Sequence, residues 1–159
     1  MTLKSQAQAT LESLPPFTQG ARTLSAADAG YQLTAGLIAL DALALSFDHI
    51  TVVSNSLAAA AIDQLKKVAD ALSKRITYLL EPISPIEVDA DQCVVQLRSN
   101  PPQRDDNGSQ YYELLVRHGG EISLRRYQKQ PGGARRAIAA QITREVFLRL
   151  VDDFAALAK

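Results

Sequence analysis

Arginine is concentrated in one part of this chain, and its planar guanidinium is well suited to hold phosphate or carboxylate groups through paired hydrogen bonds. Residues 117–136 contain six of the 17 basic residues but only one of the 17 acidic residues, so the rest of the chain is net acidic although the formal net charge is +0. We expect this segment to contact an anion or an acidic protein partner. The candidate contact residues are Arg117, Arg125, Arg126, Arg135 and Arg136.

Neighbouring residues could extend this segment into a larger site. Gly132-Gly133 could add backbone N–H donors at the start of a helix. The alternative is a solvated sheet face whose arginines pair with Glu113 or Glu121. We favour this alternative over nucleic-acid binding, because the chain lacks an uncompensated basic charge and the aromatic-glycine signature of the common RNA-binding sheet. The side chains that could otherwise stack on bases are Tyr111, Tyr112 and Tyr127.

Carboxylates form a second pattern, which could hold a hard cation such as Ca²⁺. Glu87, Asp89 and Asp91 are spaced by two and would share one face of an extended backbone. Such sites usually need six or more oxygens, and charge on an edge strand also prevents edge-to-edge pairing. The loop at Asp105–Ser109 fails as a calcium loop because its sixth position is Gln110 instead of glycine. We therefore expect no metal.

Catalysis has little support in the residue types. The only histidines are His49, which follows Asp48, and His118. A hydrolase needs a nucleophile, a base and an orienting group in contact, and no G-x-S-x-G motif is present. Cys93 sits in an apolar strand pattern, where a free thiol is usually packing. We expect a non-enzymatic protein without a cofactor.

The bulk properties predict one domain in a reducing compartment. A chain of 159 residues is long enough to bury a core, and a single cysteine excludes an internal disulfide. The first eight residues do not resemble a signal peptide. The apolar stretch 29–47 contains Asp41 and is too short and polar for a membrane span. We expect a cytoplasmic protein without membrane contact, in which this stretch is covered either within a monomer or in a homodimer.

The segment 26–53 supports two interpretations. Its first half is rich in Ala and Leu, which favour a helix over 26–40. Alternation of apolar residues then favours a strand over 42–53. The other interpretation is one long buried helix that ends at Ser46. Ser25, followed by Asp28, would begin either helix.

Elsewhere the periodicities are clearer. Leu57–Arg75 and 134–158 carry apolar stripes that predict amphipathic helices, and 3–14 predicts a short helix before Pro15. Residues 76–88, 93–97, 111–117 and 122–125 alternate as strands. Residues 99–109 predict a long exposed loop, and His118-Gly119-Gly120 predicts a tight hairpin.

These elements predict a single α+β domain over 1–159, with 1–24 as a loosely packed N-terminal arm. An antiparallel meander of about five strands would be packed by the helices at Leu57–Arg75 and 134–158. We expect a binding or protein-interaction module that uses the arginine segment. The alternative is a small-molecule carrier with a cavity between the sheet and the C-terminal helix, bordered by Cys93, Tyr112 or Gln141.

Overall fold

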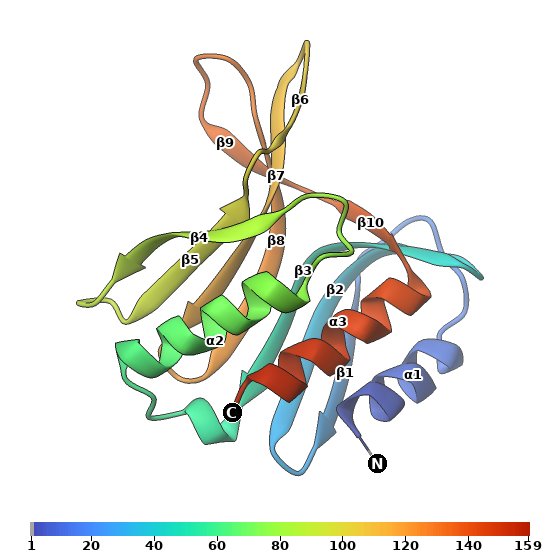
Figure 1. The fold of residues 1–159 in the computed structure, drawn as a ribbon. Helices are drawn as coiled ribbons and strands as arrows, with labels where there is room; N and C mark the ends of the chain where they lie inside the picture. The colour runs from blue at the N-terminus through green and yellow to red at the C-terminus, as the bar shows by residue number, and fades with distance from the viewer. Residues whose placement is uncertain (1) are drawn as a thin grey trace.

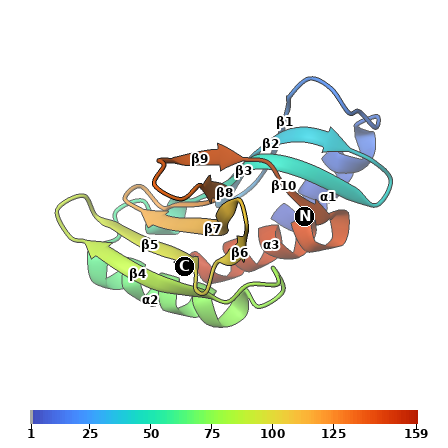
Figure 2. The same ribbon diagram turned by 90° about the horizontal axis from the view of Figure 1, so that it is seen from above.

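The computed structural model describes residues 2–159, which form a 10-stranded antiparallel sheet and three α-helices. Figures 1 and 2 show the helices on one side of this strongly twisted sheet. The main strand order is β1-β2-β3-β8-β7-β5-β4, and β10, β6 and β9 are added to β3, β7 and β8. The strands are β1 (Arg22–Asp28), β2 (Tyr31–Leu40), β3 (Ala44–Ser54), β4 (Ile83–Asp89), β5 (Val94–Ser99), β6 (Gln103–Asp105), β7 (Gly108–Arg117), β8 (Glu121–Lys129), β9 (Arg135–Ile138) and β10 (Ala140–Thr143).

The three helices bury one apolar stripe each against the sheet or against one another. They are α1 (Leu3–Ser13), α2 (Ile62–Arg75) and α3 (Arg144–Leu157), and a 3-10 turn, η1 (Asn55–Leu57), follows β3. Helix α1 contacts β1 and α3, helix α2 contacts β4 and β5, and α3 contacts β3. Phe147 and Phe154 of α3 are fully buried at the centre of the core. None of the helices in residues 2–159 is both long and apolar enough to cross a membrane.

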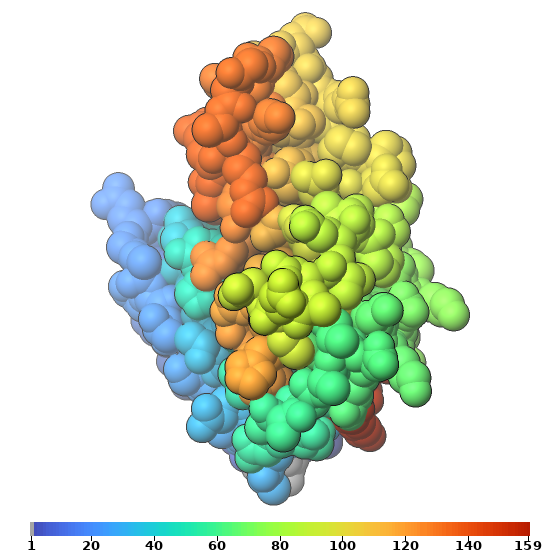
Figure 3. All heavy atoms as spheres, turned by 90° about the vertical axis from the view of Figure 1, so that its left-hand side faces the viewer, coloured from blue at the N-terminus to red at the C-terminus, as the bar shows by residue number. Residues whose placement is uncertain are grey.

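The sheet forks between β3 and β8, and this fork shapes the site described below. The two strands pair from Val53↔Glu121 to Ile50↔Leu124 and then separate. Beyond this point β8 pairs with β9 and β3 pairs with β10, so the chain runs down one arm of the fork and back along the other. The arm made by β8 and β9 projects beside the β6–β7 hairpin, as the orange and yellow regions of Figure 3 show.

The prediction of an α+β fold with an antiparallel sheet is confirmed, but the strand count of about five is too low. The main cause is segment 22–54, which forms three strands: the predicted strand over 42–53 is confirmed as β3, but neither of the predicted helices is present. Leu33, Ala35 and Leu37 face the core from β2, so pairing with two neighbouring strands overrides the helix preference of Ala and Leu. Asp28 accepts a hydrogen bond from the backbone N–H of Gly30 at 3.0 Å and forms the β1–β2 turn instead of a helix start.

The C-terminal helix begins about ten residues later than the predicted 134. Ile138 belongs to β9 and Ile142 to β10, and α3 begins at Arg144. A spacing of four places residues on one face of either a helix or a strand, so the apolar stripe could not separate the two. Thr143 caps the helix, because its Oγ1 accepts a hydrogen bond from the N–H of Val146 at 3.0 Å.

Three further boundaries differ from the predictions. The predicted loop 99–109 contains β6, which pairs with β7 around the turn before Gly108. The predicted strand at 76–82 is a loop, and β4 begins only at Ile83. The N-terminal region is packed rather than loose, since α1 buries the side chains at its core-facing positions. These are Leu3, Ala7 and Leu11, each at most 1% exposed.

Candidate ligand-binding cleft

The structure distributes the five candidate arginines over both faces of the sheet. Neighbours in a strand point to opposite faces, and Arg125 is exposed on the open face while Arg126 is buried on the helix-covered face. Arg117 on the open face pairs with Glu121 at 2.6 Å, so its charge is compensated by a neighbouring carboxylate. The five therefore do not form one site, and contact with an acidic partner stays a prediction for those on the open face.

The open face also carries two tyrosines, and arginines cover their rings. Tyr111 and Tyr127 have ring centroids 6.0 Å apart. The guanidinium of Arg98 lies 5.0 Å from the centre of the Tyr111 ring, and that of Arg135 lies 3.9 Å from the centre of Tyr127. Arg135 also pairs with the buried carboxylate of Glu113. A base could stack on these rings only after an arginine had moved.

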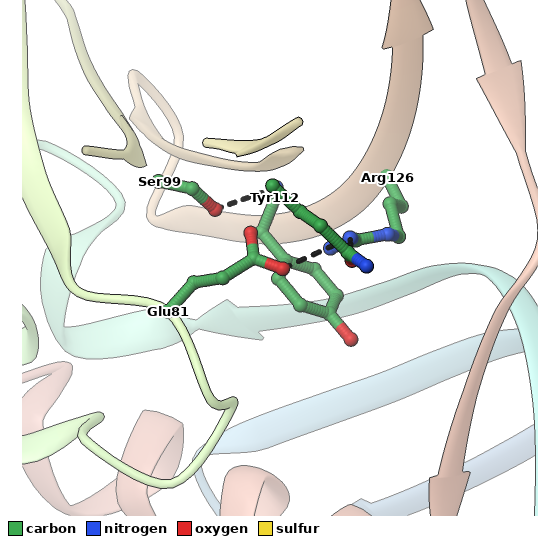
Figure 4. Close-up of polar contacts among 5 residues, drawn as sticks. Glu81, Ser99, Tyr112 and Arg126 are labelled. Carbon is green, nitrogen blue, oxygen red and sulfur yellow. Dashed lines mark hydrogen bonds and ion pairs between the residues drawn. The ribbon is translucent and has the colours of Figure 1, made fainter. Parts of the chain in front are cut away.

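Arg126 forms the most unusual polar contact of the helix-covered face. Its Nη2 donates to Oε2 of Glu81 at 2.9 Å and to Oε1 of Gln103 at 3.1 Å. Its guanidinium lies 4.4 Å from the centre of the Tyr112 ring. Figure 4 shows Glu81, from the loop before β4, pointing toward Arg126 beside the Tyr112 ring. The side chains of Arg126 and Glu81 are only 9% and 11% exposed, so this is a buried ion pair.

Each side chain of this ion pair has one terminal atom that makes no hydrogen bond. Nη1 of Arg126 and Oε1 of Glu81 are both shielded from solvent, and neither has a hydrogen-bond partner among residues 2–159. Buried polar groups without partners are rare, because each costs about 1–3 kcal/mol. The pair therefore leaves one donor and one acceptor available to a group that could reach them.

Two connected hollows lie beside this pair on the helix-covered side of the fork. The first, of about 600 Å³, is lined by Glu81, Gln103 and Arg126 together with three prolines. The second, of about 470 Å³, is more apolar and is lined by Ile142 and Val146. Both are open to solvent, and together they form the cleft. The residues common to both hollows are Leu79, Leu80, Tyr112 and Gln141.

Leu80 stands at the junction of the two hollows in a conformation that leucine rarely adopts. Its φ is 67°, in the left-handed region that favours glycine, and its side chain is 96% exposed. A leucine in this region costs about 1–2 kcal/mol relative to ordinary backbone. An exposed apolar side chain on a strained backbone marks a position at which folding alone does not explain the residue.

The loop that carries Leu80 is anchored at its start by a second polar cluster. The hydroxyl of Tyr78 donates to Oδ2 of Asp153 at 2.7 Å, and Arg75 donates to Oδ1 of the same carboxylate at 3.1 Å. Burial and the hydrogen bond to the Asp153 carboxylate raise the pKa of Tyr78 well above its ordinary value. Burial likewise raises the pKa of Tyr112. Both phenols that line the cleft therefore stay neutral and act as hydrogen-bonding groups rather than as bases.

The other candidates for chemistry lie outside the cleft. Nδ1 of His49 is 2.6 Å from Oδ1 of Asp48 on β3, and His118 occupies the exposed β7–β8 turn. Cys93 lies just before β5 with its Sγ 3.8 Å from the carbonyl oxygen of Ala60. Within residues 2–159, no three His, Cys, Asp or Glu side chains gather closely enough to hold a metal ion.

Sequence reasoning identified part of the cleft and missed its centre. Tyr112 and Gln141, two of the three residues expected to border a cavity, line it, whereas Cys93 does not. Glu81 was considered only with the neighbouring carboxylates and was not linked to Arg126, because an ion pair between residues 45 positions apart leaves no local pattern. Leu80 was not singled out. The proline-rich composition around Glu81 was the only available signal that this segment is not an ordinary strand.

No family model, no curated protein and no solved structure matches this chain.

Proposed function

We propose that this protein is a non-enzymatic binding protein and that its binding site is the cleft on the helix-covered side of the fork. The proposal keeps the class of function predicted from the sequence but moves the site from the arginine segment to the cleft. The observation that carries it is Leu80, whose exposed side chain and left-handed backbone stand at the junction of the two hollows. A ligand that covered Leu80 would bury apolar surface that the free protein leaves in water.

The polar hollow supports the same site. A ligand there would meet an unused donor on Arg126 and an unused acceptor on Glu81. Burial of the ligand in the apolar hollow beside it would provide affinity, and hydrogen bonds to the ion pair would fix the orientation of the ligand. This combination of one apolar compartment and a few convergent polar groups is typical of binding sites.

Protein-observed NMR with benzamide, an apolar ring that carries a carboxamide, tests this proposal. We expect benzamide to shift backbone amide signals around Leu80, Tyr112 and Gln141. Replacing Leu80→Asn should weaken this binding about threefold to tenfold, equivalent to about 0.7–1.4 kcal/mol. Asparagine tolerates the left-handed conformation, so the variant should fold.

Ile86→Asn is the matched control, because Ile86 is a half-exposed apolar residue of β4 outside the cleft. It should leave benzamide binding unchanged. Shifts scattered over the whole surface, or equal weakening by both variants, would contradict the proposal. Binding retained in both variants with shifts on the open face of the sheet would place the site elsewhere.

A further inference from the structure

The edge of β10 that faces the cleft has backbone groups free for pairing. Within residues 2–159, β10 pairs with no strand other than β3. The N–H of Arg144 donates to the carbonyl oxygen of Leu43 at 2.9 Å, which continues the β10–β3 ladder by one residue. In an antiparallel ladder such hydrogen-bonded pairs alternate, so Ile142 and Ala140 also point toward β3. The N–H and C=O of Gln141 therefore point away from β3.

Gln141 is also one of the residues common to both hollows. Strand β10 thus borders the cleft, which Leu79, Leu80 and Tyr112 also line. A free strand edge beside side-chain pockets is the arrangement that proteins use to bind an extended peptide as an added strand.

We propose that the ligand of the cleft is an extended segment of another polypeptide, which pairs with β10 at Gln141. This inference rests on the proposed function, since it names the class of ligand that the cleft takes. In an antiparallel pairing a single residue of the segment exchanges both hydrogen bonds with Gln141, because its N–H and C=O point to the same side.

Each of the two hollows would accept one side chain of this segment. Residues two positions apart in an extended chain share a face. One side chain enters the apolar hollow at Ile142 and Val146, and the next on that face reaches the Glu81–Arg126 pair.

The unused atoms of that pair select the chemistry of the second side chain. Nη1 of Arg126 needs an acceptor and Oε1 of Glu81 needs a donor. A carboxamide offers both, whereas a carboxylate would be repelled by Glu81 and an ammonium by Arg126. The segment therefore carries Asn or Gln two residues from an apolar residue. Both atoms are shielded in the free protein, so residues 79–82 move outward to admit this group.

Selection from a random heptapeptide library displayed on phage, against the full-length protein, tests the inference. We expect selected peptides to share an apolar residue two positions from Asn or Gln. A synthetic peptide with that pattern should slow hydrogen exchange at the backbone amide of Gln141. Methylating the backbone nitrogen that pairs with Gln141, or changing the peptide's Asn to Asp, should each weaken binding at least about tenfold.

A double replacement of the ion pair provides a variant that still folds. Glu81→Leu with Arg126→Met exchanges a buried pair for apolar residues, which proteins often tolerate. This variant should lose the preference for Asn or Gln but still bind through β10. The matched control, Glu121→Leu with Arg117→Met, removes an ion pair on the β7–β8 hairpin and should keep the preference.

The outcomes separate this inference from the proposed function. If benzamide binds in the cleft but no peptide is selected, or the selected peptides ignore N-methylation, the ligand is not an added strand and the binding function stands. If neither benzamide nor any peptide occupies the cleft, both proposals fail. Peptides that pair with β10 but show no preference for a carboxamide would overturn the role given to Glu81 and Arg126.

Discussion

Arg125 and Arg126 are neighbours in the chain, yet their surroundings have little in common. Arg125 is exposed on the open face of the sheet, while Arg126 is buried and hydrogen-bonded to Glu81. Charge counted along the chain treats the two as equivalent, because it cannot tell which face of a strand each side chain occupies. The alternation rule separates them only once the strand is assigned.

Serine substitution should reveal this difference at the level of stability. Arg126→Ser leaves the Glu81 carboxylate buried without a partner and should lower the free energy of unfolding by about 3–5 kcal/mol. Arg125→Ser should change it by less than about 0.5 kcal/mol. Urea denaturation of the two single variants is the measurement. Similar values for both would mean that the Glu81–Arg126 pair contributes nothing particular.

At the scale of elements, apolar periodicity predicted α1, α2 and most of β5, β7 and β8. It was wrong where two periods coincide. Ile138 and Ile142 are four residues apart, which fits both one helix face and one strand face, and only pairing with β8 and β3 makes them strands. Likewise, the Ala-rich stretch of β2 is a strand because β1 and β3 lie on either side of it. The residues of β2, β9 and β10 do not by themselves show which strands they will pair with.

In the β7–β8 turn, replacing each of the two glycines by alanine should lower stability by a different amount. Both have positive φ, 88° at Gly119 and 80° at Gly120. A Cβ on Gly119 would meet nothing within 4 Å, whereas one on Gly120 would collide with the backbone oxygen of Ser54 and lie 3.2 Å from Leu57. Gly119→Ala should therefore cost about 1–2 kcal/mol for the backbone conformation alone.

Gly120→Ala should cost about 2–4 kcal/mol, because overpacking adds to the same backbone cost. Thermal and urea unfolding of both variants would measure the difference. Equal losses of stability in the two variants would mean that the end of β3 and η1 shift at little cost to make room for the new Cβ.

At the scale of the whole molecule, the sequence predicted the class of fold but not which parts hold it together. The N-terminal helix is a case in point, since its few apolar residues resembled a loose arm. In the structure α1 lies against β1 and α3, so it covers one end of the core. The fork and the cleft were beyond prediction for a related reason, because they arise from strands distant in the chain.

The packing of α1 can be tested by truncating one side chain. Leu11 is 1% exposed, so Leu11→Ala should lower the free energy of unfolding by about 2–5 kcal/mol. Glu12→Ala, on the exposed side of the same helix, should change it by less than about 0.5 kcal/mol. A negligible effect of Leu11→Ala would restore the view of this region as an appended arm.

Because of the fork, the cleft is completed only by the last strand of the sheet. Strand β10 is translated after every other strand of the sheet, and it supplies one wall of the cleft together with the first turn of α3. A nascent chain that has already assembled β1 to β8 still has an open notch between β3 and β8. The cleft is therefore complete only after β10 and the first turn of α3 have been made.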